Sequence, residues 1–151
     1  MPHLVMDSPS GRIEIADKGD AITALDWTAA PADSAPPTPL LAEAKRQLDD
    51  YFAGRRDAFD LPLAPRGSEF RCRVWRALRA IPYGETRTYG QIAQTVFSAP
   101  RAVGGACGAN PIAIIIPCHR VVGSNGSQGG FSGGGGAATK QILLKLEISR
   151  N

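Results

Sequence analysis

The first part of the chain shows the alternation of polar and apolar residues that is typical of strands. Residues 12–16 (Arg-Ile-Glu-Ile-Ala) alternate, residues 17–20 carry the Asp, Lys and Gly of a turn, and residues 21–27 continue as a second strand. Residues 29–39 contain four prolines, which predicts an exposed loop. We therefore expect β structure over residues 4–27.

From Leu40 onward the apolar residues recur at helical spacing, and Gly54 is suited to end that helix. Residues 61–67 (Leu-Pro-Leu-Ala-Pro-Arg-Gly) read as a linker. The charge of the chain changes sign at the same point. We therefore predict two domains, 1–65 and 66–151. The apolar face of the predicted helix holds Leu40, Leu41, Ala44, Leu48, Tyr51 and Phe52.

The second half predicts three further helical segments. Ser68 is suited to cap the first, which residues 82–84 (Pro-Tyr-Gly) break, and Thr88 is suited to cap the second. A break at residues 98–100 precedes a segment of small residues, 101–110. The last two segments, joined by a tight turn, indicate a helix-turn-helix.

The third of these segments is unusual because its exposed side would be mostly Gly and Ala, with Arg101 at its start. A helix that reads bases in the major groove needs Arg, Asn, Gln or Ser side chains. A Gly/Ala face instead permits close approach to a backbone or a shallow groove, which favours the minor groove and shape reading. The alternative is that the small residues only allow tight helix packing.

Charge separates the two halves of the chain. Residues 1–65 carry 6 Lys/Arg against 11 Asp/Glu, a net of −5, and residues 66–151 carry 11 against 3, a net of +8. Such a one-sided basic field is expected of a protein that binds a polyanion such as nucleic acid. The plainer interpretation is a solvated helix face.

Composition excludes other classes. At 43% hydrophobic and 21% charged residues, with no apolar run long enough for a membrane span, the chain is typical of a soluble globular protein. The first residues do not have the pattern of an export signal. Three cysteines at wide spacing argue against a disulfide framework and for an intracellular setting, and two histidines without a CxxC motif make a metal site unexpected.

The clearest candidate for chemistry is Cys118. Residues 112–116 form an apolar run that predicts a buried strand or extended core segment, and Pro117 would end it abruptly. A thiol on a rigid element beside His119 and Arg120 is a candidate nucleophile, because positive charge lowers the pKa of a thiol. For Cys118 taken alone, a small buried hydrophobe is the more common interpretation.

A glycine-rich segment, 123–136, follows, and residues 137–149 predict a last helix. The segment is either a flexible linker or a pocket wall whose backbone amides face a ligand. No Gly-Lys-Ser/Thr follows it, which excludes a nucleoside triphosphate loop.

Several motifs together resemble the O6-alkylguanine-DNA alkyltransferase (methylated-DNA–protein-cysteine methyltransferase) family over nearly the whole chain. The most specific is Pro-Cys-His-Arg-Val at residues 117–121, and Arg-Ala-Val-Gly-Gly at 101–105 and Asn-Pro at 110–111 lie at matching spacing upstream. The other motifs are residues 51–54, 59–63, 74–78, 81–86, 88–93 and 130–134.

The resemblance implies an α+β fold, with an N-terminal ribonuclease-H-like α/β domain followed by a C-terminal winged helix-turn-helix domain. It also implies direct-reversal repair of DNA: a single, irreversible transfer of the alkyl group from O6-alkylguanine in double-stranded DNA to Cys118, after the nucleotide flips out of the duplex. His119 would take the thiol proton through a water, and Glu147 would orient the imidazole. No cofactor or metal, a monomer, and a cytoplasmic or nucleoid-associated location are expected.

Further residues receive roles from the same resemblance. Tyr89 would assist flipping, Arg101 would fill the gap in the base stack, and Asn110 would tie the recognition helix to the reactive segment. The residues expected at the guanine are Tyr89, Asn110, Val121, Phe131 and Ser132. The residues expected at the DNA are Thr88, Arg101, Ala102, Gly104, Gly105 and Cys107.

The chain also departs from the family pattern. Phe131 stands where relatives often have Tyr, the run at residues 133–136 is long, residues 96–100 are short, and Cys107 replaces other side chains that face DNA. Two alternatives stay open: a non-catalytic sensor of alkylated DNA and a cysteine hydrolase. Cys118 with His119 and Glu147 counts against the sensor, and the basic half counts against the hydrolase.

Overall fold

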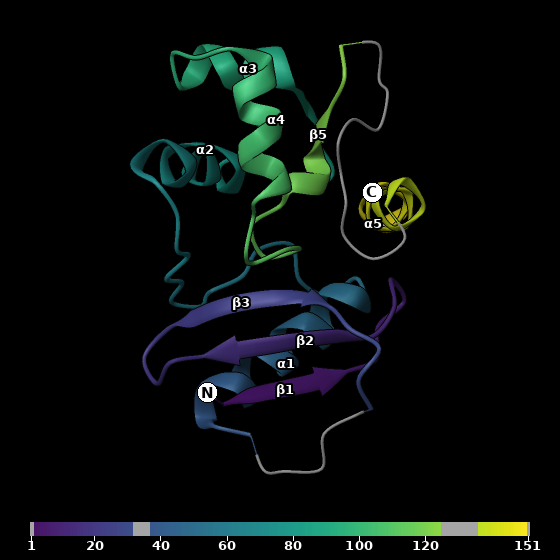
Figure 1. Cartoon of the computed structure of the whole chain (residues 1–151). Coiled ribbons are helices and arrows are strands. Elements are labelled where there is room, and N and C mark those ends of the chain that lie inside the picture. The colour runs from purple at the N-terminus through teal and green to yellow at the C-terminus, as the bar shows by residue number, and fades with distance from the viewer. Residues whose placement is uncertain (1, 32–36, 125–135, 151) are drawn as a thin grey trace.

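Three strands and one helix form the first part of the molecule. In the computed structural model, which describes residues 2–31, 37–124 and 136–150, β1 (His3–Met6), β2 (Ile13–Asp17) and β3 (Ile22–Trp27) form an antiparallel sheet in that order. The helix α1 (Pro39–Phe52) covers one face of this sheet (Figure 1). The β structure and the helix predicted from the sequence are confirmed.

Local sequence signals explain where α1 begins and ends. The side chain of Thr38 accepts a hydrogen bond from the Leu41 amide, and Pro39 occupies the first turn, where its missing N–H costs nothing. Gly54 adopts a φ of 77° just beyond the helix, a conformation that glycine reaches without a steric penalty. The buried face of α1 includes Leu41, Leu48 and Tyr51.

The free edge of β3 binds two segments that lie far apart in the sequence. The Ile22 amide donates to the Pro62 carbonyl and the Ala64 amide donates to the Ile22 carbonyl, each at 2.8 Å. Further along the strand, Leu25 exchanges hydrogen bonds with Pro111 and Ala113 in the same way. The predicted linker and the segment that leads to Cys118 are thus both fixed to the sheet.

The second part is mainly helical. It contains α2 (Glu69–Arg79), α3 (Tyr89–Thr95), α4 (Pro100–Gly108) and α5 (Ala137–Arg150), with β4 (Arg87–Thr88) paired in parallel to β5 (Val121–Val122). The helices α3 and α4 pack against each other across a short turn, which confirms the predicted helix-turn-helix. The α+β class, with an α/β part followed by this helical part, is confirmed as well.

Side chains connect α2 to α4. Ser68 and Thr88 cap α2 and α3 as expected, and Thr88 forms a full capping box with Gln91. The buried indole of Trp75 donates to the Ala106 carbonyl at 2.9 Å, which fixes α4 on α2. One apolar cluster runs from the sheet through α1, α2, α3 and α4 to α5, so both parts share a core. Within the described ranges, no helix is long and apolar enough to cross a membrane.

Candidate active site

Two tight turns bring Cys118 to its position. The Ile115 amide donates to the Ala113 carbonyl at 2.8 Å around Ile114, whose φ is 71°, and the Cys118 amide donates to the Ile116 carbonyl at 2.8 Å around Pro117. Both are three-residue γ-turns, and the first places a β-branched residue at positive φ, which costs on the order of 1–3 kcal/mol. The expectation of a continuous strand or extended segment over residues 112–116 is therefore wrong, although the run is buried as expected.

Asn110 holds these turns together. Its side-chain oxygen accepts from the Ile112 amide at 3.0 Å and its side-chain nitrogen donates to the Ile116 carbonyl at 2.9 Å. Asn110 lies immediately beyond α4, so one side chain connects the end of that helix to the segment that carries Cys118. The position matches the tie that the sequence predicts for it.

Cys118 opens a single 3₁₀ turn, Cys118–Arg120, and is 6% exposed. Burial raises the pKa of the Cys118 thiol, although a hydrogen bond with Asn110 and the charge of Lys140 lower it in part. The expectation of a low thiol pKa is therefore wrong. The reason is that the Arg120 guanidinium is directed at Glu147 and contributes its charge there.

A residue that the sequence analysis missed supplies the positive charge near the thiol. Lys140, in the first half of α5, is fully buried and its Nζ donates to the Val121 carbonyl. Its charge acts on both Cys118 and Cys107. Burial lowers the pKa of Lys140, whereas the two thiols raise it. The only sequence signal was a lysine on the inward side of the last predicted helix, next to the apolar pair 143–144.

Glu147 is the centre of a buried polar cluster. Its carboxylate accepts hydrogen bonds from one side chain of α1, from two side chains of the 3₁₀ turn and from the backbone amide of Gly84. These donors are Tyr51 Oη at 2.6 Å, His119 Nε2 at 2.7 Å, Arg120 Nε at 2.9 Å, Arg120 Nη2 at 3.0 Å and the Gly84 amide at 3.3 Å. Arg120 also donates to the Ile81 carbonyl at 2.7 Å. The cluster confirms the contact between His119 and Glu147, and adds Tyr51 and Arg120 to it.

The electrostatics of this cluster fix the state of the histidine. Burial alone would raise the pKa of Glu147, but the hydrogen bonds and charges of His119 and Arg120 outweigh it and bring that pKa to about 2. Burial lowers the pKa of His119, against the opposing effect of Glu147. At neutral pH, Glu147 is an ionised acceptor and His119 a neutral imidazole, so the proton of His119 resides on Nε2.

The other ring nitrogen of His119 is left as an acceptor. Nδ1 is buried and has no hydrogen-bond partner among the residues that the structure describes. A neutral imidazole with its proton on Nε2 carries a lone pair on Nδ1, which is the state a general base requires. The cluster can therefore take up one proton on the residue that directly follows Cys118.

The residues expected around the guanine lie near this centre as far as they are described. Tyr89 begins α3, and Lys140 Nζ lies 5.8 Å from the centre of its ring. The Val121 carbonyl accepts from Lys140, and its expected contact with the guanine stays a prediction. Phe131 and Ser132 lie outside the described residues, so their expected contacts stay predictions.

The surface of α4 has the small-residue character that the sequence predicts. Arg101, Ala102 and Gly105 are exposed, and a Cβ built on Gly105 meets no atom within 4 Å. Gly104 faces the ring of Tyr89, 3.9 Å from such a Cβ. Cys107 is half-buried against the core, and burial raises its pKa to about 12. The charge of Cys118 raises the pKa of Cys107 as well, and the contact of Cys107 with DNA stays a prediction.

One cavity adjoins the segment that carries Cys118, at Ile114, Ile115 and Pro117. It has a volume of about 360 Å³ and lies between residues 57–59, the end of α2 with the loop 80–83, and the turn at Ile114. Pro117 and Arg120 contribute to its wall, whereas Cys118 does not. Of the residues expected at the guanine, none that the structure describes lines this cavity.

Two family models match the chain, and together they cover most of it. The model of the "6-O-methylguanine DNA methyltransferase, ribonuclease-like domain" matches residues 1–65, and that of the "6-O-methylguanine DNA methyltransferase, DNA binding domain" matches residues 69–149.

Curated relatives agree with these models. A methylated-DNA–protein-cysteine methyltransferase of Mycolicibacterium paratuberculosis is 49% identical over 159 residues, covering 96% of this chain and 91% of the relative. One of Methanosarcina acetivorans is 57% identical over 109 residues, covering 71% and 69%. Among solved structures, Mycobacterium tuberculosis OGT in complex with DNA superposes with a TM-score of 0.87 at 46% identity, covering 98% and 93%.

Proposed function

The chain belongs to the methylated-DNA–protein-cysteine methyltransferase family, whose members repair DNA by direct reversal, and on that premise we propose that Cys118 is the residue that accepts the alkyl group. The observation that carries the proposal is the position of Cys118 beside a neutral His119 whose free acceptor nitrogen is buried and whose other nitrogen is fixed by Glu147. A buried thiol with a raised pKa needs such a base.

The transfer is a single displacement. The thiol proton passes through a water to His119 Nδ1, and the thiolate attacks the alkyl carbon on O6 of guanine. The sulfur–carbon bond forms as the carbon–oxygen bond breaks, and the electron pair stays on O6. The departing guanine then receives a proton. In total, the alkyl group moves from guanine to the protein and one proton moves from the protein to guanine. The product thioether is not readily hydrolysed, so each protein molecule acts once.

Lys140 and Asn110 support this step from two sides. The ammonium of Lys140 stabilises the thiolate as the proton leaves, because it lies in a region from which water is excluded. Asn110 fixes the γ-turns that carry Cys118 and lowers the pKa of its thiol in part, which supports both the position and the ionisation of the nucleophile.

We further propose that the protein binds double-stranded DNA through the minor groove, as a monomer, with α4 in the groove. The exposed Gly/Ala face of α4 supports this, because a backbone can then lie close to the floor of the groove. Arg101, at the start of α4, would occupy the gap in the stack, and Tyr89 would contact the flipped base. Thr88, Ala102, Gly104, Gly105 and Cys107 would line the DNA. The proposal also includes two domains, residues 1–65 and 66–151, and a cytoplasmic location.

Intact-mass measurement tests the proposed acceptor. Incubation with O6-benzylguanine, or with a duplex that contains O6-methylguanine, is expected to add one alkyl group per chain, and peptide mapping is expected to place it on Cys118. Cys118→Ser should abolish the adduct, while Cys72→Ser, at a half-buried thiol on α2, should retain it. An adduct on another residue, or none, contradicts the proposal.

A further inference from the structure

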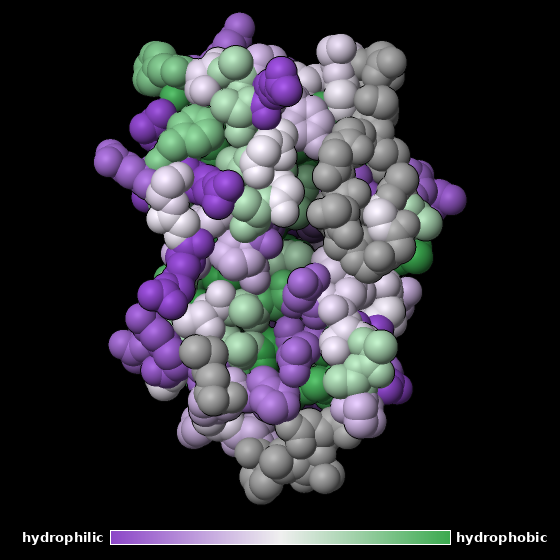
Figure 2. All heavy atoms as spheres, in the orientation of Figure 1, coloured by the Kyte–Doolittle hydropathy of each residue, from purple (hydrophilic) through white to green (hydrophobic). Residues whose placement is uncertain are grey.

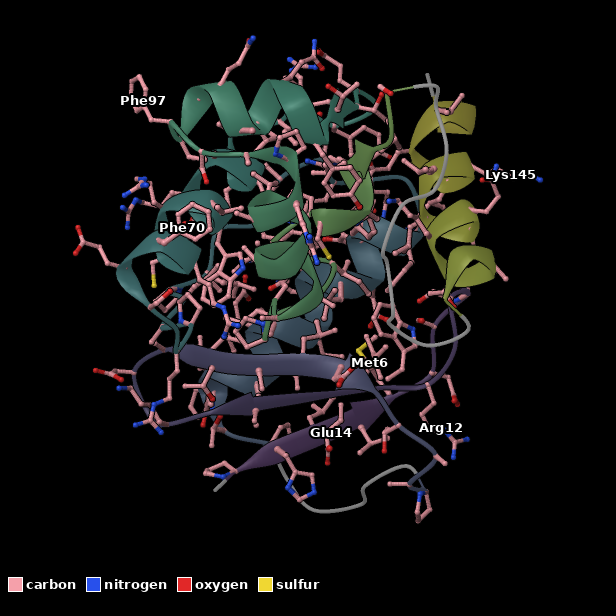
Figure 3. The ribbon with its side chains drawn as sticks, turned by 45° about the horizontal axis from the view of Figure 1, so that its top comes forward. Met6, Arg12, Glu14, Phe70, Phe97 and Lys145 are labelled. Atoms are coloured by element: carbon pink, nitrogen blue, oxygen red, sulfur yellow. The ribbon has the colours of Figure 1, made fainter. Side chains whose placement is uncertain are left out.

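The turn between α3 and α4 exposes a large aromatic side chain. Phe97 is 93% exposed and adopts a φ of 57°. The Ser98 amide donates to the Ala93 carbonyl at 2.9 Å, so Phe97 occupies the left-handed position of a helix C-terminal motif. In Figure 3, its ring points away from the body of the molecule at the outer end of α3.

Neither property of Phe97 benefits the fold. The left-handed position favours glycine, because a Cβ there crowds the following carbonyl oxygen. A fully exposed phenyl ring gains almost nothing from burial. A bulky residue that is held in a disfavoured conformation is a reason to look for a partner outside the chain.

The turn is supported by α2. The Arg73 guanidinium donates to the carbonyl of Val96, the residue before Phe97, at 3.1 Å, and lies 5.4 Å from the centre of the Phe70 ring. Arg73 thus connects the Phe70 ring to the backbone of the turn that carries the exposed Phe97 ring. We call Phe70, Arg73 and Phe97 the aromatic edge. Figure 2 shows hydrophobic atoms interspersed with hydrophilic ones over α2 and α3 on this face.

Charge indicates the kind of partner. Within the described ranges, both basic residues of α1 form ion pairs, Lys45 with Asp49 and Arg46 with Glu43, and Arg12, just before β2, pairs with Asp7. None of the four arginines of α2 has a carboxylate within ion-pair distance in that part of the chain, although all four are exposed. These arginines are Arg71, Arg73, Arg76 and Arg79. Arginines without a carboxylate partner beside one exposed ring, Phe97, and one half-buried ring, Phe70, match a phosphate backbone with its sugars and base edges.

We propose that the aromatic edge is a second contact with DNA, next to the groove that α4 occupies, with the Phe97 ring against sugars or base edges and the α2 arginines at phosphates. This proposal rests on the proposed function, since it extends the interface of α4. Phe97 lies four residues before Arg101, on the turn that leads into α4, so the two surfaces are continuous. Apolar side chains inserted at a groove are a common way to hold bent or opened DNA.

Substitution of Phe97 separates this role from a structural one. Phe97→Gly is expected to raise the melting temperature, because it relieves the backbone, and yet to weaken binding to an undamaged duplex about tenfold at fixed salt. Phe97→Tyr keeps the ring and is expected to keep the affinity. Benzyl transfer from free O6-benzylguanine, which involves no DNA, should proceed at the same rate in all three proteins, whereas repair of methylated duplex should slow in Phe97→Gly.

Equal duplex affinity of Phe97→Gly and the parent protein overturns the proposal. The proposal is also overturned if Phe97→Gly binds duplex as tightly as the parent under conditions in which sedimentation shows only monomers. The Phe97 ring would then contact a second copy of the chain rather than DNA. If the parent protein takes an alkyl group neither from O6-benzylguanine nor from methylated duplex, the proposed function fails instead, and the comparison of duplex affinities still decides the role of Phe97.

Discussion

Lys140, rather than Arg120 two residues after the cysteine, carries the positive charge that acts on the Cys118 thiol. Arg120 lies two residues from Cys118 but forms a bidentate pair with Glu147, and a charge engaged in this way does little for a neighbouring group. Lys140 lies 22 positions further along the chain and reaches the same site from α5. Adjacency in sequence thus indicated the wrong cation.

Lys140→Met is expected to slow alkyl transfer roughly tenfold at neutral pH, since loss of the charge raises the pKa of Cys118 further. The thiolate is the reactive form, so the deficit should shrink as the pH rises. Benzyl transfer followed across a pH series measures this directly. Lys145→Met, an exposed position on the same helix, is the control and should follow the parent profile. A deficit that stays constant with pH would assign Lys140 a purely structural role.

Glu147 makes stability depend on acid. Its pKa is about 2 in the folded protein against an ordinary value of 4.5. A carboxylate with a lowered pKa stabilises the fold above its unfolded pKa, and this contribution disappears as the pH falls through about 4.5 toward 2. The shift corresponds to about 3 kcal/mol. We therefore expect the unfolding free energy, measured with urea, to decrease over this pH range.

Glu43 provides the matched comparison, because its pKa is also about 2 but it pairs with Arg46 at the surface. High salt should remove the contribution of Glu43 and leave that of Glu147, which is shielded from solvent. At high salt, Glu43→Gln should therefore retain the acid dependence and Glu147→Gln should lose most of it. A parent protein whose stability is flat down to pH 3 at high salt would contradict this expectation.

At the scale of elements, α4 has one face that serves the fold and one that is free to serve DNA. Its inner face is fixed by Trp75 of α2. The Trp75 ring also packs on Gly67, which precedes α2, and a Cβ built there would lie 2.5 Å from the ring. The outer face of α4 at Gly105 meets nothing. The same substitution, glycine to alanine, should therefore act oppositely at the two positions.

Gly105→Ala is expected to stabilise the protein by up to about 1 kcal/mol, because alanine is the better helix former, and to weaken duplex binding, because the new methyl group projects toward the groove. Gly67→Ala is expected to destabilise by about 1–3 kcal/mol, because Trp75 must move. Thermal unfolding and duplex affinity at fixed salt check both. Unchanged affinity in Gly105→Ala would exclude this face of α4 from the interface.

Regular elements were predictable because their signals are local. Ser68, Thr88 and Gly54 mark helix ends through bonds and dihedral angles within a few residues, and the structure confirms them. The γ-turns over residues 112–118 were missed since an apolar run carries no period that distinguishes a strand from a folded loop. The roles of Tyr51 and Lys140 depend on partners 96 and 19 positions away, which no local pattern contains.

At the scale of the whole molecule, Glu147 connects parts that the sequence separates. Tyr51 reaches it from α1, His119 and Arg120 from the reactive turn, and Gly84 from the loop after α2. The helix α1 therefore does more than cover the sheet, because its Tyr51 side chain helps to fix the carboxylate that orients the His119 imidazole. The continuous core makes the same connection with apolar contacts.

Tyr51→Phe tests how far the two parts act as one unit. The substitution removes a buried hydrogen bond to a charged acceptor and should cost about 2 kcal/mol in unfolding free energy. Because the core is shared, unfolding should stay a single transition. A double-mutant cycle with Glu147→Gln isolates the pair, and a favourable coupling is expected. The benzyl-transfer rate should also fall, because His119 then depends on a carboxylate with one fewer fixed partner. Full stability and full rate in Tyr51→Phe would show that α1 contributes nothing to the reactive centre.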